Sequence, residues 1–170
     1  RTLASGSADS TIVLWDMTSG QGRKLPGHSG IVYTVVFSPD GRAVVTSSDS
    51  GVLHLWDVAS GRLLHVLLGH DAGILSVAFS PNGKRVASGD RKGGLRLWDT
   101  LSGEELHSVE VGKEYVSALA FFPGSEAVAI GCYDKTLRVL NAIDGTLRVL
   151  RKGEHSVASV AVSADGRRVA

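Results

Sequence analysis

The sequence predicts an all-β protein built from small antiparallel sheets, because two markers of one repeat recur along the chain. Trp-Asp, or Leu-Asn in the last copy, begins at Trp15, Trp56, Trp98 and Leu140, at spacings of 41, 42 and 42 residues. A turn-forming segment begins at Ser38, Ser80, Phe122 and Ser163, at spacings of 42, 42 and 41 residues. Two unrelated markers with one period indicate a repeat architecture.

Each repeat is predicted to hold four short strands and no helix. In the best-defined repeat, apolar and β-branched runs near 31–37, 43–48, 52–57 and 62–67 are separated by turns such as Pro39-Asp40-Gly41 and Ser60-Gly61. Alternation of apolar and polar residues is typical of strands, and no segment shows helical spacing. We therefore expect four-stranded antiparallel sheets.

These sheets cannot bury both of their apolar faces alone. Neighbouring sheets must cover them, and a radial arrangement covers both faces while leaving only short edges, which predicts a segment of a β-propeller. The predicted sheet boundaries are 1–27 (the end of one blade), 28–68, 69–111, 112–152 and 153–170 (the start of the next).

Gly-His near the start of a repeat, Ser-Pro-Asp-Gly in the middle and Trp-Asp near the end together resemble the WD-repeat family over almost the whole chain. The resemblance implies that these four or so repeats belong to a ring of about seven or eight blades. A small ring is the alternative if 157–162 joins 3–25, and self-association to complete the ring is another. The chain begins without Met and stops inside a predicted strand, so we expect both ends to be cut.

The resemblance also implies a buried hydrogen-bonded tetrad of His, Ser or Thr, Asp and Trp in each blade. Counting from each Trp assigns it to Ser5, Asp9 and Trp15; His28, Thr46 and Trp56; His70, Ser88 and Trp98; and Asp134. Ser50 and Lys92 stand where two of the Asp residues should be, with Asp49 just before Ser50, and Ile130 and Leu140 replace the hydroxyl and the Trp of the last blade. We therefore expect no complete tetrad, and we expect Asp134 to keep only backbone contacts in its turn.

Catalysis is not expected, although Ser, His and Asp recur together as in a nucleophile, base and orienting carboxylate. An active site has no reason to occur once per blade. The sequence contains no phosphate-binding glycine loop and no metal-ligand spacing, so no cofactor or metal is implied. The segment from Gly89 to Gly94 is expected to be a turn, with anion binding by Arg91 and Lys92 as the alternative. His65 and His107 share one repeat position and are expected on the outer strands.

Composition argues against nucleic acid and membrane partners. A formal charge of +1 gives no large field for binding polyanions, and no apolar run is long enough to span a bilayer. The single cysteine, Cys132, cannot form an internal disulfide, which favours a reducing compartment and therefore a cytoplasmic location.

Protein or peptide binding is the expected function, on the narrow face around the central channel where members of the resembled family commonly hold peptides. Residues at the inner strand ends on that face include Ala8, Asp49, Arg91, Tyr133, Tyr33, Leu75, Ser117 and Ala158. Tyr33, Leu75, Arg91 and Tyr133, with Asp49, are the predicted partner contacts, since large side chains at loop tips usually contact something. Capping of the blade cores is the alternative role for them.

We therefore predict a non-catalytic scaffold or adaptor. The alternatives are a regulatory module of a larger signalling enzyme, such as a kinase or a nucleotide-hydrolysing switch protein, and a propeller hydrolase that depends on His70.

Overall fold

The computed structural model describes residues 1–170 and contains fifteen strands arranged in four sheets. The first sheet has three strands, β1 (Thr2–Gly6), β2 (Ile12–Asp16) and β3 (Gly22–Leu25). The second has four, β4 (Val32–Phe37), β5 (Ala43–Ser48), β6 (Leu53–Asp57) and β7 (Leu63–Leu67). The third consists of β8 (Ile74–Phe79), β9 (Arg85–Asp90), β10 (Gly94–Asp99) and β11 (Glu105–Glu110), and the fourth of β12 (Val116–Phe121), β13 (Ala127–Cys132), β14 (Thr136–Asn141) and β15 (Leu147–Lys152). No helix in the structure could span a membrane.

Strands that follow one another in the sequence pair antiparallel within each sheet, so each sheet is a simple meander. The all-β fold and its four-stranded sheets confirm the predicted fold class. The segment 157–170 differs from the expectation of strands, because it forms only an isolated bridge between Val162 and Val169.

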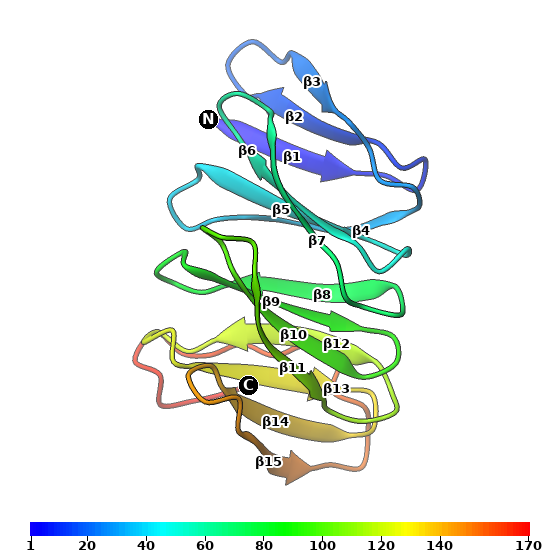
Figure 1. The fold of residues 1–170 in the computed structure, drawn as a ribbon. Helices are drawn as coiled ribbons and strands as arrows, with labels where there is room; N and C mark the ends of the chain where they lie inside the picture. Colours follow the sequence, from blue (N-terminus) through cyan, green and yellow to red (C-terminus); the bar gives the residue numbers. More distant parts are fainter.

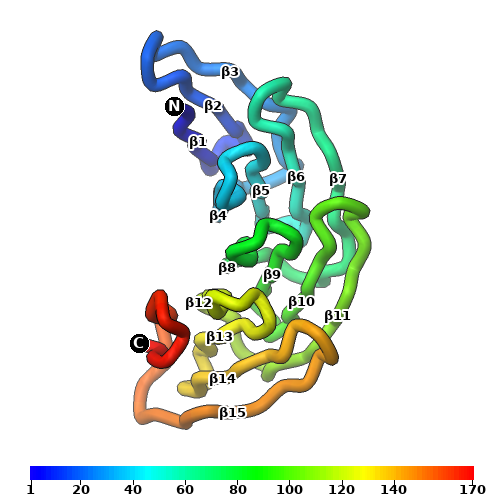
Figure 2. The backbone as a smooth tube through the Cα atoms, turned by 90° about the vertical axis from the view of Figure 1, so that its left-hand side faces the viewer, coloured from blue at the N-terminus to red at the C-terminus, as the bar shows by residue number.

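The sheets stack one above another (Figure 1), and the stack curves around a common concave side (Figure 2). Figure 2 shows the first strands β4, β8 and β12 along the concave side and the last strands β7, β11 and β15 along the convex side. The arc is open, and the small-ring alternative is wrong for this chain. β1 pairs only with β2, while Val157 donates its amide to Cys132 O of the fourth sheet at 3.1 Å.

The core lies between the sheets, in three clusters that correspond to the three junctions. Ile12 and Leu14 of the first sheet pack with Val44 and Trp56 of the second. Leu53 and Leu55 of the second sheet pack with Val86 and Trp98 of the third. The largest cluster joins Leu95 and Leu97 of the third sheet to Ile130 and Leu140 of the fourth. Each sheet is therefore buried by its neighbours rather than by itself.

The repeat tryptophans show how much burial depends on a preceding sheet. Trp56 and Trp98 are 1% and 2% exposed, and each packs against the sheet before it. Trp15 has no sheet before it and is 36% exposed. The same residue type at the same repeat position is thus buried only where a neighbour covers it.

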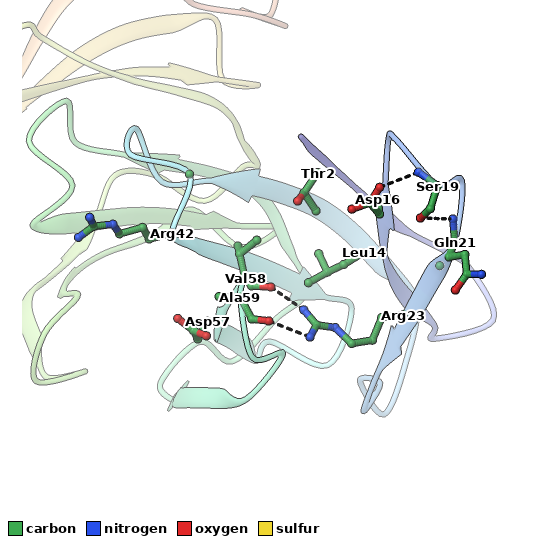
Figure 3. A pocket seen from close by; sticks show the side chains of 12 residues that line it. Thr2, Leu14, Asp16, Ser19, Gln21, Arg23, Arg42, Asp57, Val58 and Ala59 are labelled. Atoms are coloured by element: carbon green, nitrogen blue, oxygen red, sulfur yellow. Dashed lines mark hydrogen bonds between the residues drawn. The ribbon is translucent and has the colours of Figure 1, made fainter.

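A repeated hydrogen bond also joins the outer strands to the next sheet. His65 Nε2 donates to Leu101 O at 3.0 Å, and His107 Nε2 donates to Ile143 O at 3.2 Å. At the first junction, Arg23 takes this role and donates to Val58 O and Ala59 O at 2.5 and 2.9 Å, as Figure 3 shows. The two histidines lie on outer strands, but they connect sheets as well as covering them.

The glycines of the accepting turns make this contact possible. Gly103 has a φ of 75°, and a β-carbon there would lie 2.7 Å from the ring of His65. Gly145 has a φ of 74° and stands in the same relation to His107, at 2.9 Å. Glycine therefore serves both the left-handed turn and the close approach of the neighbouring side chain.

We predict that His65→Ala lowers the free energy of unfolding by about 1 kcal/mol, because it removes the hydrogen bond to the Leu101 carbonyl. Urea titration at neutral pH measures the change. Val149→Ala is the matched control, since Val149 occupies the same repeat position but is exposed. Equal effects of the two substitutions would contradict a role for the His65 hydrogen bond.

Candidate partner-binding surface

Two sets of connections come together at one edge of the stacked sheets, which we call the turn face. It consists of the loops before the innermost strands (28–31, 70–73 and 112–115) and the turns between second and third strands (49–52, 91–93 and 133–135). In each complete sheet a backbone hydrogen bond joins the two. Asp49, Arg91 and Tyr133 donate their amides to Ile31 O, Gly73 O and Tyr115 O, respectively, at 3.0, 3.1 and 2.9 Å.

A β-bulge recurs where each innermost strand leaves this face. The pairing register shifts between Val32 and Thr34, between Ile74 and Ser76, and between Val116 and Ala118. The residues skipped are Tyr33, Leu75 and Ser117. A bulge leaves its extra residue out of the regular pairing and redirects its side chain. The bulge therefore gives the side chains of these three residues a different direction from those of their strand neighbours.

Tyr33 and Arg91 form a contact between two sheets on the turn face. Arg91 Nη2 donates to the Tyr33 hydroxyl at 2.8 Å, and the guanidinium carbon lies 4.9 Å from the ring centroid. Arg91 remains exposed, whereas Tyr33 is half-buried. The tyrosine therefore orders a cation at the surface through both its hydroxyl and its ring.

A second aromatic pair lies on the fourth sheet. The rings of Tyr115 and Tyr133 are 5.4 Å apart at an angle of 34°, and the residues are 43% and 53% exposed. The sequence prediction did not include Tyr115. Its position in the loop directly before an innermost strand was the available signal. Leu75 is half-buried, and its carbonyl accepts a hydrogen bond from Thr34 of the preceding sheet at 3.2 Å.

Asp49 is exposed on the turn of the second sheet, where its side chain packs against Gly30. A β-carbon on Gly30 would come within 1.9 Å of Asp49 Oδ1, so the approach requires glycine. The predicted contacts Tyr33, Arg91 and Asp49 thus lie on two adjacent sheets, while Tyr133 lies on a third. Tyr133 contacts Tyr115 and is not part of the contact between Tyr33 and Arg91.

A complete tetrad lies beneath this face in the third sheet, which corrects the expectation that none is complete. His70 Nδ1 is 2.7 Å from Asp90 Oδ2, His70 Nε2 is 2.7 Å from Ser88 Oγ, and Trp98 Nε1 donates to Ser88 Oγ at 2.8 Å. Counting back from Trp98 placed the carboxylate at position 92, which is Lys92. The carboxylate comes instead from Asp90, two residues earlier. Lys92 is exposed.

Asp90 also satisfies its own turn. Its Oδ1 accepts the amides of Lys92 and Gly94, each at 2.8 Å. Burial alone would raise the pKa of Asp90, but hydrogen bonds from His70 and these amides hold it below its usual value. The amides that an external anion would need are therefore already occupied. This favours the turn over the anion site as the role of residues 89–94.

Ser88, His70 and Asp90 have the order of a nucleophile, a base and an orienting carboxylate, but Ser88 is inaccessible. It is completely buried, and its oxygen lies between His70 and Trp98. Trp98 Nε1 donates to Ser88 Oγ, and the ionised Asp90 carboxylate can only accept, so His70 Nδ1 donates to it. The chain of hydrogen bonds ties β9 and β10 to the loop before β8 and presents no nucleophile to a substrate.

The second sheet has an incomplete version of the same network. His28 Nε2 is 2.7 Å from Thr46 Oγ1, which accepts Trp56 Nε1 at 3.0 Å. Ser48 occupies the position equivalent to Asp90 and pairs with Ser50 at 2.7 Å. His28 Nδ1 is consequently buried without a partner.

His54 packs against this unpartnered histidine. The rings of His28 and His54 are stacked 4.1 Å apart at 7°, and His54 Nδ1 is also buried without a partner. Burial, followed by the proximity of His54, lowers the pKa of His28 from 6.5 to about 4, and burial lowers the pKa of His54. Both rings are therefore neutral at pH 7.

The remaining two sheets hold only parts of the tetrad. In the first, Trp15 Nε1 donates to Ser5 Oγ at 2.9 Å, while Asp9 accepts from Thr11. In the fourth, Ile130 and Leu140 are buried as an apolar pair.

The expectation that Asp134 keeps only backbone contacts is wrong. Its carboxylate accepts the Thr136 amide and hydroxyl, and it forms an ion pair with Arg138 Nη2 at 2.6 Å. Arg138 occupies the repeat position of His54. Gly112 occupies the repeat position of His28 and His70, so the fourth sheet has no histidine to pair with this carboxylate.

Acid should destabilise the second sheet through His28. Because its pKa is about 4 when folded and 6.5 ordinarily, the unfolded chain binds the proton first as the pH falls. Stability is therefore full above pH 6.5 and decreases toward pH 4, with a slope approaching about 1.4 kcal/mol per pH unit. Urea titrations from pH 7 to pH 4.5 measure it. His28→Gln should show a smaller decrease, and identical pH profiles would contradict the assignment.

Ser48→Asp should supply the missing carboxylate and raise the free energy of unfolding at pH 7 by about 1 kcal/mol. The reciprocal change, Asp90→Ser, should lower it by about 1–3 kcal/mol because it strands His70 Nδ1. Thermal and urea unfolding of both variants provide the measurement. A loss of stability in Ser48→Asp would show that desolvation of the new carboxylate outweighs its bond to His28.

Comparison with known proteins agrees with this architecture. The family model described as WD domain, G-beta repeat, matches residues 1–16, 20–57, 61–99 and 103–141. The segment 20–57 contains β3 together with β4, β5 and β6, so each repeat joins the last strand of one sheet to the first three of the next. This offset ties neighbouring sheets covalently.

Relatives of known identity match over shorter stretches. The small ribosomal subunit protein RACK1y of Oryza sativa subsp. japonica is 39% identical over 67 residues, which are 39% of this chain and 20% of the rice protein. The guanine nucleotide-binding protein subunit beta of Nicotiana tabacum is 43% identical over 68 residues, 39% of this chain and 18% of the relative. WD repeat-containing protein SL1-17 of Schistosoma mansoni is 37% identical over 62 residues, 36% of this chain and 21% of the relative. The matched part of the chain thus spans about a fifth of these relatives. Because the family model matches four successive repeats that cover most of the chain, the protein belongs to the WD-repeat family.

Proposed function

We propose that this chain is part of a non-catalytic scaffold that docks partner proteins or peptides on the turn face. The supporting observation is the bulge and turn that recur in each complete sheet and present Tyr33, Leu75, Arg91 and Tyr133 at one edge. Side chains held by repeated backbone geometry lose little conformational freedom on binding.

The chemistry of this surface suits protein partners. Tyrosine and arginine are the residue types that contribute most to binding energy at interfaces, and the turn face has exposed examples of both. The buried tetrad of the third sheet and the partial network of the second lie below it and stabilise the loops that carry these residues. The names of two relatives, a protein of the small ribosomal subunit and a subunit of a guanine nucleotide-binding protein, describe components of larger assemblies. A role in an assembly is what we infer for this chain.

A substitution set on the turn face tests the proposal. Tyr33→Ala, Arg91→Ala and Tyr133→Ala combined should abolish or weaken by at least about tenfold the binding of the partners that the wild type recovers in affinity purification with mass spectrometry.

The control carries Arg148→Ala and Val149→Ala on the convex strand β15, which are also exposed. It should recover the same partners as the wild type. Unchanged recovery by the turn-face variant, or equal losses in both variants, would refute docking on the turn face. Circular dichroism and unfolding midpoints establish that both variants are folded.

A further inference from the structure

A groove of about 340 Å³ lies between the second and third sheets, at the edge opposite the turn face. In an antiparallel meander, successive turns lie at alternate ends of the strands, so every second turn lies on the same side of the molecule. The turns 38–42, 57–61, 80–84 and 99–104 therefore belong to this opposite edge. The groove is bounded by Leu64, Leu101, Phe79 and Pro39, with Asp40 and Asp57 also lining it.

The equivalent junction between the third and fourth sheets is bridged by side chains. Arg85 Nη1 donates to Ser125 O at 3.2 Å, and Ser125 Oγ accepts the amide of Asn82 at 3.3 Å. Ser125 is buried and has a φ of 62°, a conformation that glycine usually occupies. A strained serine is thus retained where its hydroxyl reaches the neighbouring sheet.

The junction that holds the groove lacks this bridge, because two repeat positions carry different residues there. Ala43 occupies the repeat position of Arg85, and Gly83 occupies that of Ser125. The Gly83 carbonyl instead accepts Thr100 Oγ1 of its own sheet at 2.8 Å. No side-chain hydrogen bond joins the turn 38–42 to the turn 80–84, although a β-carbon at Gly83 would have space, with Pro39 3.8 Å away.

The walls expose apolar side chains on a fixed backbone. Leu101 is 89% exposed, but its carbonyl is held by His65 of the second sheet. Leu64 is 47% exposed on the other wall. Two large aliphatic side chains therefore face solvent at the mouth of a groove, and the turn that carries one of them cannot retract without breaking a bond between sheets.

The charged groups define the polarity of the occupant. Two aspartates and Arg42 line the groove, which gives it one net negative charge. Hydrogen bonds from Ser38 to Asp40 and from Ser60 to Asp57 lower the pKa of both carboxyls, so both are ionised at neutral pH. These bonds use Oδ1 in each case, and Oδ2 of each aspartate has no hydrogen bond within the chain.

We propose that this groove is a second docking site, distinct from the turn face, for a linear peptide of a partner protein that inserts a large aliphatic side chain and carries an adjacent lysine or arginine. The aliphatic side chain packs between Leu64 and Leu101. The cation binds the free carboxylate oxygens of Asp40 and Asp57.

Selection from a random linear peptide library displayed on phage tests the proposal, with the wild type and a bridged variant, Ala43→Arg with Gly83→Ser, as parallel targets. The wild type should enrich peptides with an aliphatic residue next to a basic one. The bridged variant should not, because it restores the bridge seen between the third and fourth sheets.

Synthetic copies of the enriched peptides then provide affinities by fluorescence anisotropy. Leu101→Ser should weaken binding by at least about tenfold. Ile143→Ser, at the same repeat position of the fourth sheet and 60% exposed, should leave it unchanged. Leu101 is so exposed that its replacement leaves the core intact, so this pair decides the question even if the bridged variant fails to fold.

Absence of any consensus on the wild type would overturn the proposal, as would an acidic consensus or equal binding by Leu101→Ser. The turn-face variant with Tyr33, Arg91 and Tyr133 replaced should bind these peptides normally. Failure of docking on one face is therefore distinguishable from failure on the other.

Discussion

The mutual covering of neighbouring sheets is the constraint on which the structure depends. Each sheet has apolar side chains on both faces, and the three core clusters lie between sheets rather than within them. Burial of one Trp side chain contributes up to roughly 5 kcal/mol, and Trp56 and Trp98 obtain it from the sheet that precedes them. The outer hydrogen bonds of Arg23, His65 and His107 fix the same junctions from the convex side.

Because this apolar packing holds every sheet, the buried hydrogen-bond network can differ from one sheet to the next. The His70 network is complete and gives Nδ1 of its histidine a partner in Asp90, whereas the fourth sheet replaces two members by Ile130 and Leu140 and reuses Asp134 in an ion pair. Replacing both partners of a buried hydrogen bond by apolar groups costs little, while removing one partner strands the other. The second sheet is the stranded case, with His28 Nδ1 unpartnered against His54.

Local patterns predicted the sheets, and their limits explain what was missed. Alternating residues and turn glycines lie within one strand or one turn, so the strands near 43–48 and 62–67 were found almost to the residue. The tetrad carboxylate was misplaced because a fixed count from Trp98 ignores the freedom of a turn, in which Asp90 can reach His70 from two residues earlier. The contacts of Tyr33 with Arg91 and of His28 with His54 join residues far apart in sequence, and no single-strand pattern contains them.

Hydrogen exchange of the three Trp indole N–H groups, followed by NMR, tests the central claim most directly. All three groups donate to a Ser or Thr hydroxyl within their own sheet, and Trp56 and Trp98 are in addition covered by a preceding sheet. The account predicts slow exchange for Trp56 and Trp98 and fast exchange for Trp15. Equal protection of all three would show that each sheet is stable without its neighbour, and would contradict the account.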